Sequence, residues 1–129
     1  MLYKPKQQFI LSKTPQLLEM RYKAIIVSDL HLGTKDSKAE EFIDFLEEHP
    51  TELLILNGDI IDGWRLERKF YWPQSHSNVI RRILTSAKRG TNVVYIAGNH
   101  DELLRRLIPF VGNFGQIRIQ NYYRYVGVN

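Results

Sequence analysis

Three short apolar runs in the chain each end in polar residues of the kinds that bind metal ions. They read AIIVSDLH at 24–31, LLILNGDIID at 53–62 and VVYIAGNHD at 93–101. An apolar run of this length that breaks at Gly, Asn or Asp is typical of a buried strand and the turn at its carboxyl end. The pattern therefore predicts strands at 22–28, 51–57 and 91–97.

Two stretches between these strands have apolar residues at helical spacing. The first stripe is Ala39, Phe42, Ile43 and Leu46, and the second is Ile80, Ile83, Leu84 and Ala87. A capping box of Ser37 and Glu40 is the predicted start of the first helix, and Ser75 or Ser77 that of the second, which Gly90 ends. Strands that alternate with helices predict an α/β fold with βαβ units and a parallel sheet.

The rest of the chain adds a predicted loop, a short helix and two strands. Residues 63–74 are predicted to form an aromatic-rich loop, residues 102–108 a helix, and residues 116–120 and 122–128 two further strands. Apolar side chains at 103–111 fit an acyl chain or a membrane interface, or packing in the core. We expect one domain at 22–129 after an amino-terminal extension at 1–21.

The polar residues at the three strand ends predict a metal site. Parallel strands place their carboxyl ends at one edge of the sheet, which would bring together Asp29, His31, Asp59 and Asn99. In an extended Asp-x-His segment both side chains point to the same side. Such oxygen and imidazole ligands suit Mn²⁺, Mg²⁺, Fe²⁺ or Zn²⁺. Asp59, on the middle strand, is the candidate to bridge two ions about 3.5–4 Å apart that activate a shared water for attack on phosphorus.

Four neighbouring residues have supporting roles in this interpretation. His100, at a predicted helix start, could donate a hydrogen bond or proton to phosphate oxygens. Asp62 and Asp101 could orient an imidazole or a ligand water. Arg65 could bind a substrate phosphate in bidentate fashion, although an exposed arginine needs no such role.

Charge and composition narrow the function classes. The net charge is +4, and residues 65–89 hold seven Lys or Arg but a single acidic residue, Glu67. This segment favours an anionic substrate or is a solvated helix face. The aromatics of 63–74 could stack on a nucleotide or cover the core.

The absence of Cys excludes thiolate metal sites, and no apolar run suggests a signal peptide or membrane span, so we expect a cytoplasmic protein. His49 and His76 lack any motif and are predicted at the surface.

The strand-end motifs resemble those of the calcineurin-like metallophosphoesterase superfamily. Its order Asp-x-His, Gly-Asp-x-x-Asp and Gly-Asn-His-Asp is matched at 29–31, 58–62 and 98–101. The flanking residues SDLHLGT from Ser28, NGDIIDGWR from Asn57 and IAGNHDE from Ile96 are most similar to the UDP-2,3-diacylglucosamine pyrophosphatase family of lipid A synthesis. The resemblance implies hydrolysis of UDP-2,3-diacylglucosamine to UMP and 2,3-diacylglucosamine 1-phosphate with Mn²⁺, in the cytoplasm or peripherally at the inner membrane.

The resemblance covers the amino-terminal half of the family's α/β/β/α sandwich. The later half of that domain supplies a further His and a Gly-His-x-His motif, and this chain has no His after His100. We therefore expect an incomplete second metal site and little activity of the chain alone. The apolar surface of the sheet would be covered by a second copy, by swapped strands or by aggregation.

Three other functions are consistent with the same motifs. A nucleic-acid phosphodiesterase, which is not favoured, would use the basic segment and its aromatics as a groove. A metal-binding module without catalysis, or a purely structural fragment, would also carry these motifs.

Overall fold

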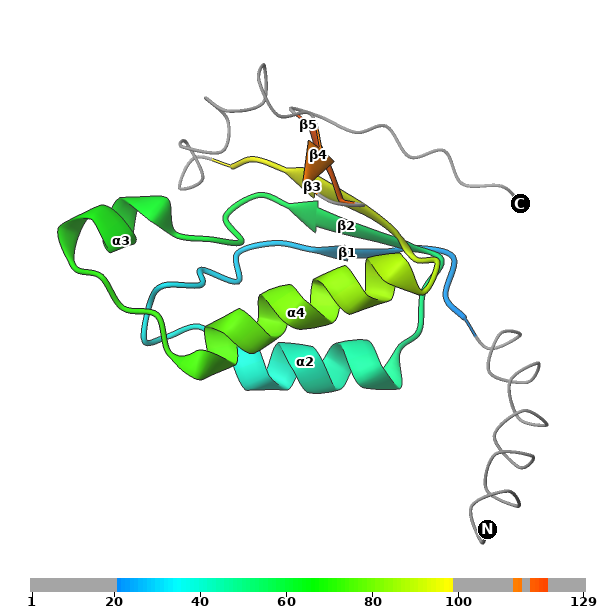
Figure 1. Ribbon diagram of the computed structural model, residues 1–129, viewed down its shortest axis with the longest axis horizontal. Helices are drawn as coiled ribbons and strands as arrows, with labels where there is room; N and C mark the ends of the chain where they lie inside the picture. The colour runs from blue at the N-terminus through cyan, green and yellow to red at the C-terminus, as the bar shows by residue number, and fades with distance from the viewer. Residues whose placement is uncertain (1–20, 99–112, 115–116, 121–129) are drawn as a thin grey trace, which may run out of the picture.

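A five-stranded sheet forms the centre of the protein. The structure, a computed structural model, describes residues 21–98, 113–114 and 117–120. The strand order is β1 (Ile25–Val27), β2 (Leu53–Asn57), β3 (Asn92–Ile96), β5 (Ile117–Gln120) and β4 (Asn113–Phe114) (Figure 1). All neighbouring pairs are parallel except the antiparallel pair of β4 and β5. The predicted α/β fold is confirmed, whereas the strand predicted at 122–128 and the helix at 102–108 lie outside the described residues.

Two helices, α2 (Ala39–Glu48) and α4 (Gln74–Lys88), cover the same face of the sheet (Figure 1). Side chains alternate along β2, so that Leu54 and Leu56 face these helices within the main core. Leu53 and Ile55 form a second apolar cluster with Val94. Because β2 and β3 are apolar on both faces, they read in the sequence as continuous apolar runs. Within the described ranges, no helix has both the length and the apolar character needed to cross a membrane.

The predicted serine caps are wrong, because Lys38 and Pro73 occupy the cap positions and Ser75 and Ser77 both lie inside α4. Lys38 precedes α2 and makes no capping hydrogen bond through its side chain. The Ser37 hydroxyl instead donates to the Leu30 carbonyl oxygen (2.6 Å). At the start of α4 the Ser77 hydroxyl oxygen accepts a hydrogen bond from Trp72 Nε1 (2.9 Å), and Pro73 occupies the cap position. Ser37 thus tethers the loop that follows β1 rather than the helix.

The segment predicted as a loop begins with a helix, α3 (Gly63–Arg68). The side chain of Asp62 caps this helix by accepting a hydrogen bond from Arg65 N (2.9 Å). No residue of α3 is buried, so the sequence lacks the apolar stripe by which a helix is recognised. Two aromatic residues of the 63–74 segment are not core residues, since Trp64 is 51% exposed and Phe70 is 78% exposed.

The prediction that His76 lies at the surface is also wrong. This side chain is only 3% exposed, in the stripe of α4 that includes Val79 and Ile83. Its Nδ1 accepts a hydrogen bond from Gly33 N (3.0 Å). Burial lowers the pKa of His76, because a protonated imidazole would be poorly solvated there. His49 is half-buried and stacks on Phe45, with ring centroids 4.3 Å apart.

We expect acid to destabilise the metal-free protein through His76. As the pH falls below about 6.5, the unfolded chain takes up a proton that the folded chain does not, because the pKa of the folded form is lowered. As the pH falls from about 6.5 to the lowered pKa of the folded form, the free energy of unfolding should decrease. Urea unfolding at pH 7.5 and pH 5.5 should show a larger loss for the wild type than for His76→Asn. Equal losses would contradict this role of His76.

Candidate metal centre

The loops after β1 and β2 stay hydrogen bonded to each other beyond the ends of the strands. Asp29 N donates to Gly58 O (3.2 Å), and His31 N donates to Asp59 O (2.9 Å). The parallel register of the two strands thus continues into the loops. It places the Asp-x-His motif directly beside the Gly-Asp motif.

Asp29, His31 and Asp59 share an uncommon backbone conformation. Their φ angles are 57°, 49° and 55°, and within the described ranges they are the non-glycine residues with positive φ. Asp and His tolerate this left-handed region better than most residues, but it remains strained and is found mainly at functional sites. The conformation also corrects one expectation, because Asp29 and His31 converge through two left-handed residues rather than through the alternation of an extended strand.

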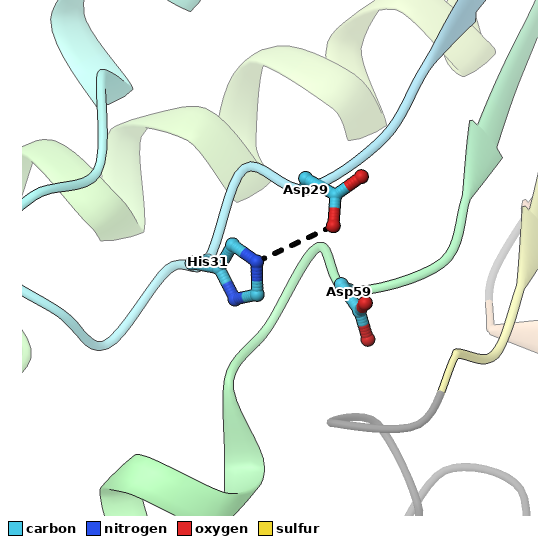
Figure 2. Close-up of side chains that lie close together, drawn as sticks. All are labelled: Asp29, His31 and Asp59. Carbon is cyan, nitrogen blue, oxygen red and sulfur yellow. Dashed lines mark ion pairs between the residues drawn. The ribbon is translucent and has the colours of Figure 1, made fainter.

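The three side chains lie close together on the two loops, with the Asp29 carboxylate facing the His31 ring (Figure 2). Each offers one ligand atom, and these atoms all lie within 4.8 Å of one another. His31 Nε2 is 3.4 Å from Asp29 Oδ1. Asp29 is exposed while His31 and Asp59 are half-buried, so the group is open to solvent. Asn99, His100 and Asp101, the remaining predicted residues of the third motif, lie outside the described residues.

The buried carboxylate of Asp62 orients His31. Asp62 is 3% exposed, and its Oδ2 lies 3.0 Å from His31 Nδ1. A carboxylate only accepts hydrogen bonds, so Nδ1 carries the proton and a neutral ring has its lone pair on Nε2. That lone pair is on the nitrogen nearest to Asp29 Oδ1. Two electron-rich atoms held this close favour a cation, and the donor set of two carboxylates and one imidazole fits a divalent metal ion.

Asp29 is held in its charged form. A hydrogen bond with the side chain of Ser28 lowers the pKa of Asp29, and this effect is larger than the opposing effect of desolvation. The carboxylate is therefore ionised at neutral pH and able to bind a cation.

A cleft of about 250 Å³ lies beside Asp29 and His31. Its lining consists of Asp29, Leu30, His31, Thr34, Asp36, Lys38, Asp62 and Arg65. Arg65, the predicted phosphate ligand, is exposed here at the start of α3. Lys38 supplies a second cation, which the sequence analysis missed because nothing in the motifs points to it. Because three carboxylates, Asp29, Asp36 and Asp62, line the same cleft, these two basic side chains would favour an anion there once a bound metal ion offsets the negative charge.

The end of β3 packs closely against Asp59. A Cβ atom on Gly98 would lie 2.6 Å from both the N and the Oδ1 atoms of Asp59, and 2.9 Å from Gly58 Cα. Only glycine permits this approach. The third predicted motif therefore begins in direct contact with the second.

Asp62→Asn should lower the affinity for Mn²⁺ roughly 10-fold, as is typical when a residue that orients a metal-binding histidine is changed. The change removes the charge opposite His31 Nδ1, while asparagine still caps α3. Calorimetric titration of the metal-free protein measures the affinity. Asp62→Ala should show the same loss of affinity and, in addition, a lower melting temperature because the cap is gone. An Asp62→Asn variant with the wild-type affinity would contradict the orienting role.

Comparison with known proteins agrees with this geometry. Residues 22–128 match the family model described as calcineurin-like phosphoesterase. No curated protein and no solved structure matches the chain at the level of similarity that we required. The family match spans the β1, β2 and β3 loops that carry the candidate ligands, and enzymes of this family use divalent metal ions. The chain belongs to the calcineurin-like phosphoesterase family.

Proposed function

We propose that this metal-dependent phosphoester hydrolase cleaves the pyrophosphate bond of UDP-2,3-diacylglucosamine, releasing UMP and 2,3-diacylglucosamine 1-phosphate. The observation that carries the hydrolytic function is the convergence of Asp29, His31 and Asp59, whose ligand atoms lie within 4.8 Å of one another. The substrate is proposed from the residues around the motifs, SDLHLGT, NGDIIDGWR and IAGNHDE, which resemble the pyrophosphatases of lipid A synthesis.

In this proposal each residue of the site has a defined task. Asp29, His31 and Asp59 hold divalent ions, with Mn²⁺ the expected species and Asp59 shared between two of them. Asn99 would add an amide oxygen to this incomplete ligand set, and Asp101 would support the ligands from outside. Bound divalent ions supply a water of lowered pKa and neutralise the phosphate charge.

The phosphates of the substrate meet the basic side of the cleft. Arg65 and Lys38 line the cleft next to the candidate ligands, where they would bind the pyrophosphate oxygens. His100 donates a hydrogen bond or proton to a phosphate oxygen as charge develops. Trp64, next to Arg65 in α3, is 51% exposed and has the Arg68 guanidinium 4.2 Å from its ring centroid, and a cation–π pair of this kind could contact the base of a nucleotide substrate.

Incubation of the purified chain with Mn²⁺ and UDP-2,3-diacylglucosamine tests the proposal. Because the second metal site is expected to be incomplete, we expect slow UMP release, detected by chromatography, that is abolished by EDTA and by Asp59→Asn. Hydrolysis of bis(p-nitrophenyl) phosphate without UMP release would retain the phosphodiesterase chemistry and overturn the lipid substrate. Cleavage of single-stranded DNA in preference to the lipid nucleotide would support a nucleic-acid phosphodiesterase instead. Binding of Mn²⁺ without hydrolysis of any of these substrates would indicate a non-catalytic module.

The same proposal places the protein in the cytoplasm, in peripheral contact with the inner membrane that receives the lipid product. Cell fractionation tests this location. We expect the protein in the cytosolic fraction at high salt and partly with membranes at low salt, because basic side chains bind anionic lipids through screened electrostatic attraction. Recovery outside the cytoplasm would overturn it.

A further inference from the structure

We propose that His76 on α4 is a positioning residue for the metal centre and acts through the backbone of Gly33. The inference rests on the proposed function, because it assigns His76 a role in the affinity for the metal ion. His76 belongs to none of the family motifs and is separated from the Asp-x-His motif by the whole of α2, β2 and α3. Its side chain nevertheless bonds directly to the turn that follows His31.

A hydrogen bond between buried groups connects His76 to this turn. Gly33 N donates to His76 Nδ1 over 3.0 Å, and both groups are buried. A buried backbone N–H that loses its acceptor is destabilised by the full desolvation of that group. Gly33 has a φ of 103°, so the chain turns sharply at this residue. His76 is therefore the acceptor that keeps a sharp turn in place.

Thr34 links this turn to His31. The Thr34 hydroxyl and Thr34 N both donate to the His31 carbonyl oxygen, over 2.9 and 3.2 Å. On the other side of the turn, Leu66 of α3 packs so tightly that a Cβ on Gly33 would lie 2.7 Å from Leu66 Cγ. A shift of Gly33 would therefore be transmitted to His31. The position of the imidazole depends on Asp62 at one end of this segment and on His76 at the other.

Two aromatic neighbours hold the side chain of His76 rigidly. Its ring meets Tyr71 and Trp72 edge-on, at centroid distances of 5.9 and 5.5 Å. Trp72 is fixed in turn by the hydrogen bond from its Nε1 to Ser77 Oγ. Burial keeps the imidazole neutral, which preserves the lone pair on Nδ1. A rigid acceptor of this kind sets the position of the turn, whereas a mobile one would follow it.

The test separates the hydrogen bond from the packing of the ring. His76→Asn keeps an acceptor atom at the place of Nδ1, while His76→Phe keeps a ring and removes the acceptor. Ile83→Val, buried in the same helix two turns away, is the matched control for lost packing. The measurements are calorimetric titration with Mn²⁺ and hydrogen exchange of the Gly33 amide in the metal-free protein. The amide exchange reports on the hydrogen bond without any metal or activity.

We expect His76→Phe to bind Mn²⁺ roughly 10-fold more weakly and to lose protection of the Gly33 amide. His76→Asn should restore most of the affinity and of the protection, and Ile83→Val should keep both while its melting temperature falls. Should His76→Phe fail to fold, His76→Leu replaces it as the variant without the acceptor, and His76→Asn must still exceed it in affinity and in amide protection. Wild-type affinity in a folded variant without the acceptor, or no advantage of Asn over Phe or Leu, overturns the inference alone. A wild-type chain that binds no Mn²⁺ overturns the proposed function and this inference with it.

Discussion

Asp59→Asn should lower both the hydrolysis of phosphodiesters and the affinity for Mn²⁺ by more than about 100-fold. Loss of a residue that merely supports a ligand typically costs about 10–100-fold, and loss of the ligand itself should cost at least as much. Asparagine keeps the shape of the side chain and tolerates the left-handed φ of 55° at this position. The variant therefore removes the charge at the centre of the group and leaves the backbone in place.

Thermal unfolding with and without Mn²⁺ measures the same effect independently of activity. An ion that binds only the folded chain stabilises it by about 2.7 kcal/mol when present at 100 times its dissociation constant. The wild type should show this increase in melting temperature, and Asp59→Asn should not.

Two further variants make the result specific to Asp59. Asp44→Asn, on the exposed side of α2, removes the same charge away from the site and should change neither the affinity nor the activity. Asp59→Ala should lose metal binding like Asp59→Asn but unfold at a lower temperature, because alanine in the left-handed region costs about 1–2 kcal/mol. An Asp59→Asn protein that retains wild-type Mn²⁺ affinity would remove Asp59 from the ligand set.

The sequence predicts the position of this site because the same residues indicate both where a strand ends and which side chains can bind a metal ion. Apolar runs that end in Asp-x-His and Gly-Asp mark both a strand end and a set of ligands. Parallel pairing then brings Asp29, His31 and Asp59 to one edge, where their ligand atoms lie within 4.8 Å of one another. The local geometry could not be predicted in the same way. The left-handed φ angles of these residues depend on hydrogen bonds between two loops that are distant in the chain.

The parts of the protein that the sequence does not reveal are those held by polar contacts. α3 begins at the cap made by Asp62 and buries none of its residues, so no periodic pattern announces it. His76 occupies an apolar stripe, and its position three residues before Val79 was the available sign of burial. Hydropathy assigns a histidine to the surface by default, and only the pairing with the Gly33 amide explains its place in the core.

Gly98→Ala should reduce hydrolysis about 100-fold and destabilise the protein by about 1–3 kcal/mol. The new methyl group would meet Asp59 N and Oδ1 at 2.6 Å, so either the end of β3 or the Asp59 loop must move. A displacement of about 1 Å in a catalytic group can lower the rate about 100-fold. Hydrolysis of bis(p-nitrophenyl) phosphate and calorimetric titration with Mn²⁺ measure the activity and the ligand geometry separately.

Gly90→Ala is the matched control, because the two glycines are required for different reasons. Gly90 has a φ of 105°, and no atom of the described residues lies within 4 Å of the place that a new methyl group would take. Alanine there adds backbone strain of about 1–2 kcal/mol without a clash. Both variants should therefore unfold at lower temperature, but only Gly98→Ala should weaken Mn²⁺ binding. If both variants bound Mn²⁺ as the wild type does, the approach of β3 to Asp59 would serve packing alone. A loss of Mn²⁺ affinity in Gly98→Ala but not in Gly90→Ala would show that the close approach of the Gly98 backbone to Asp59 couples the third motif to the metal centre.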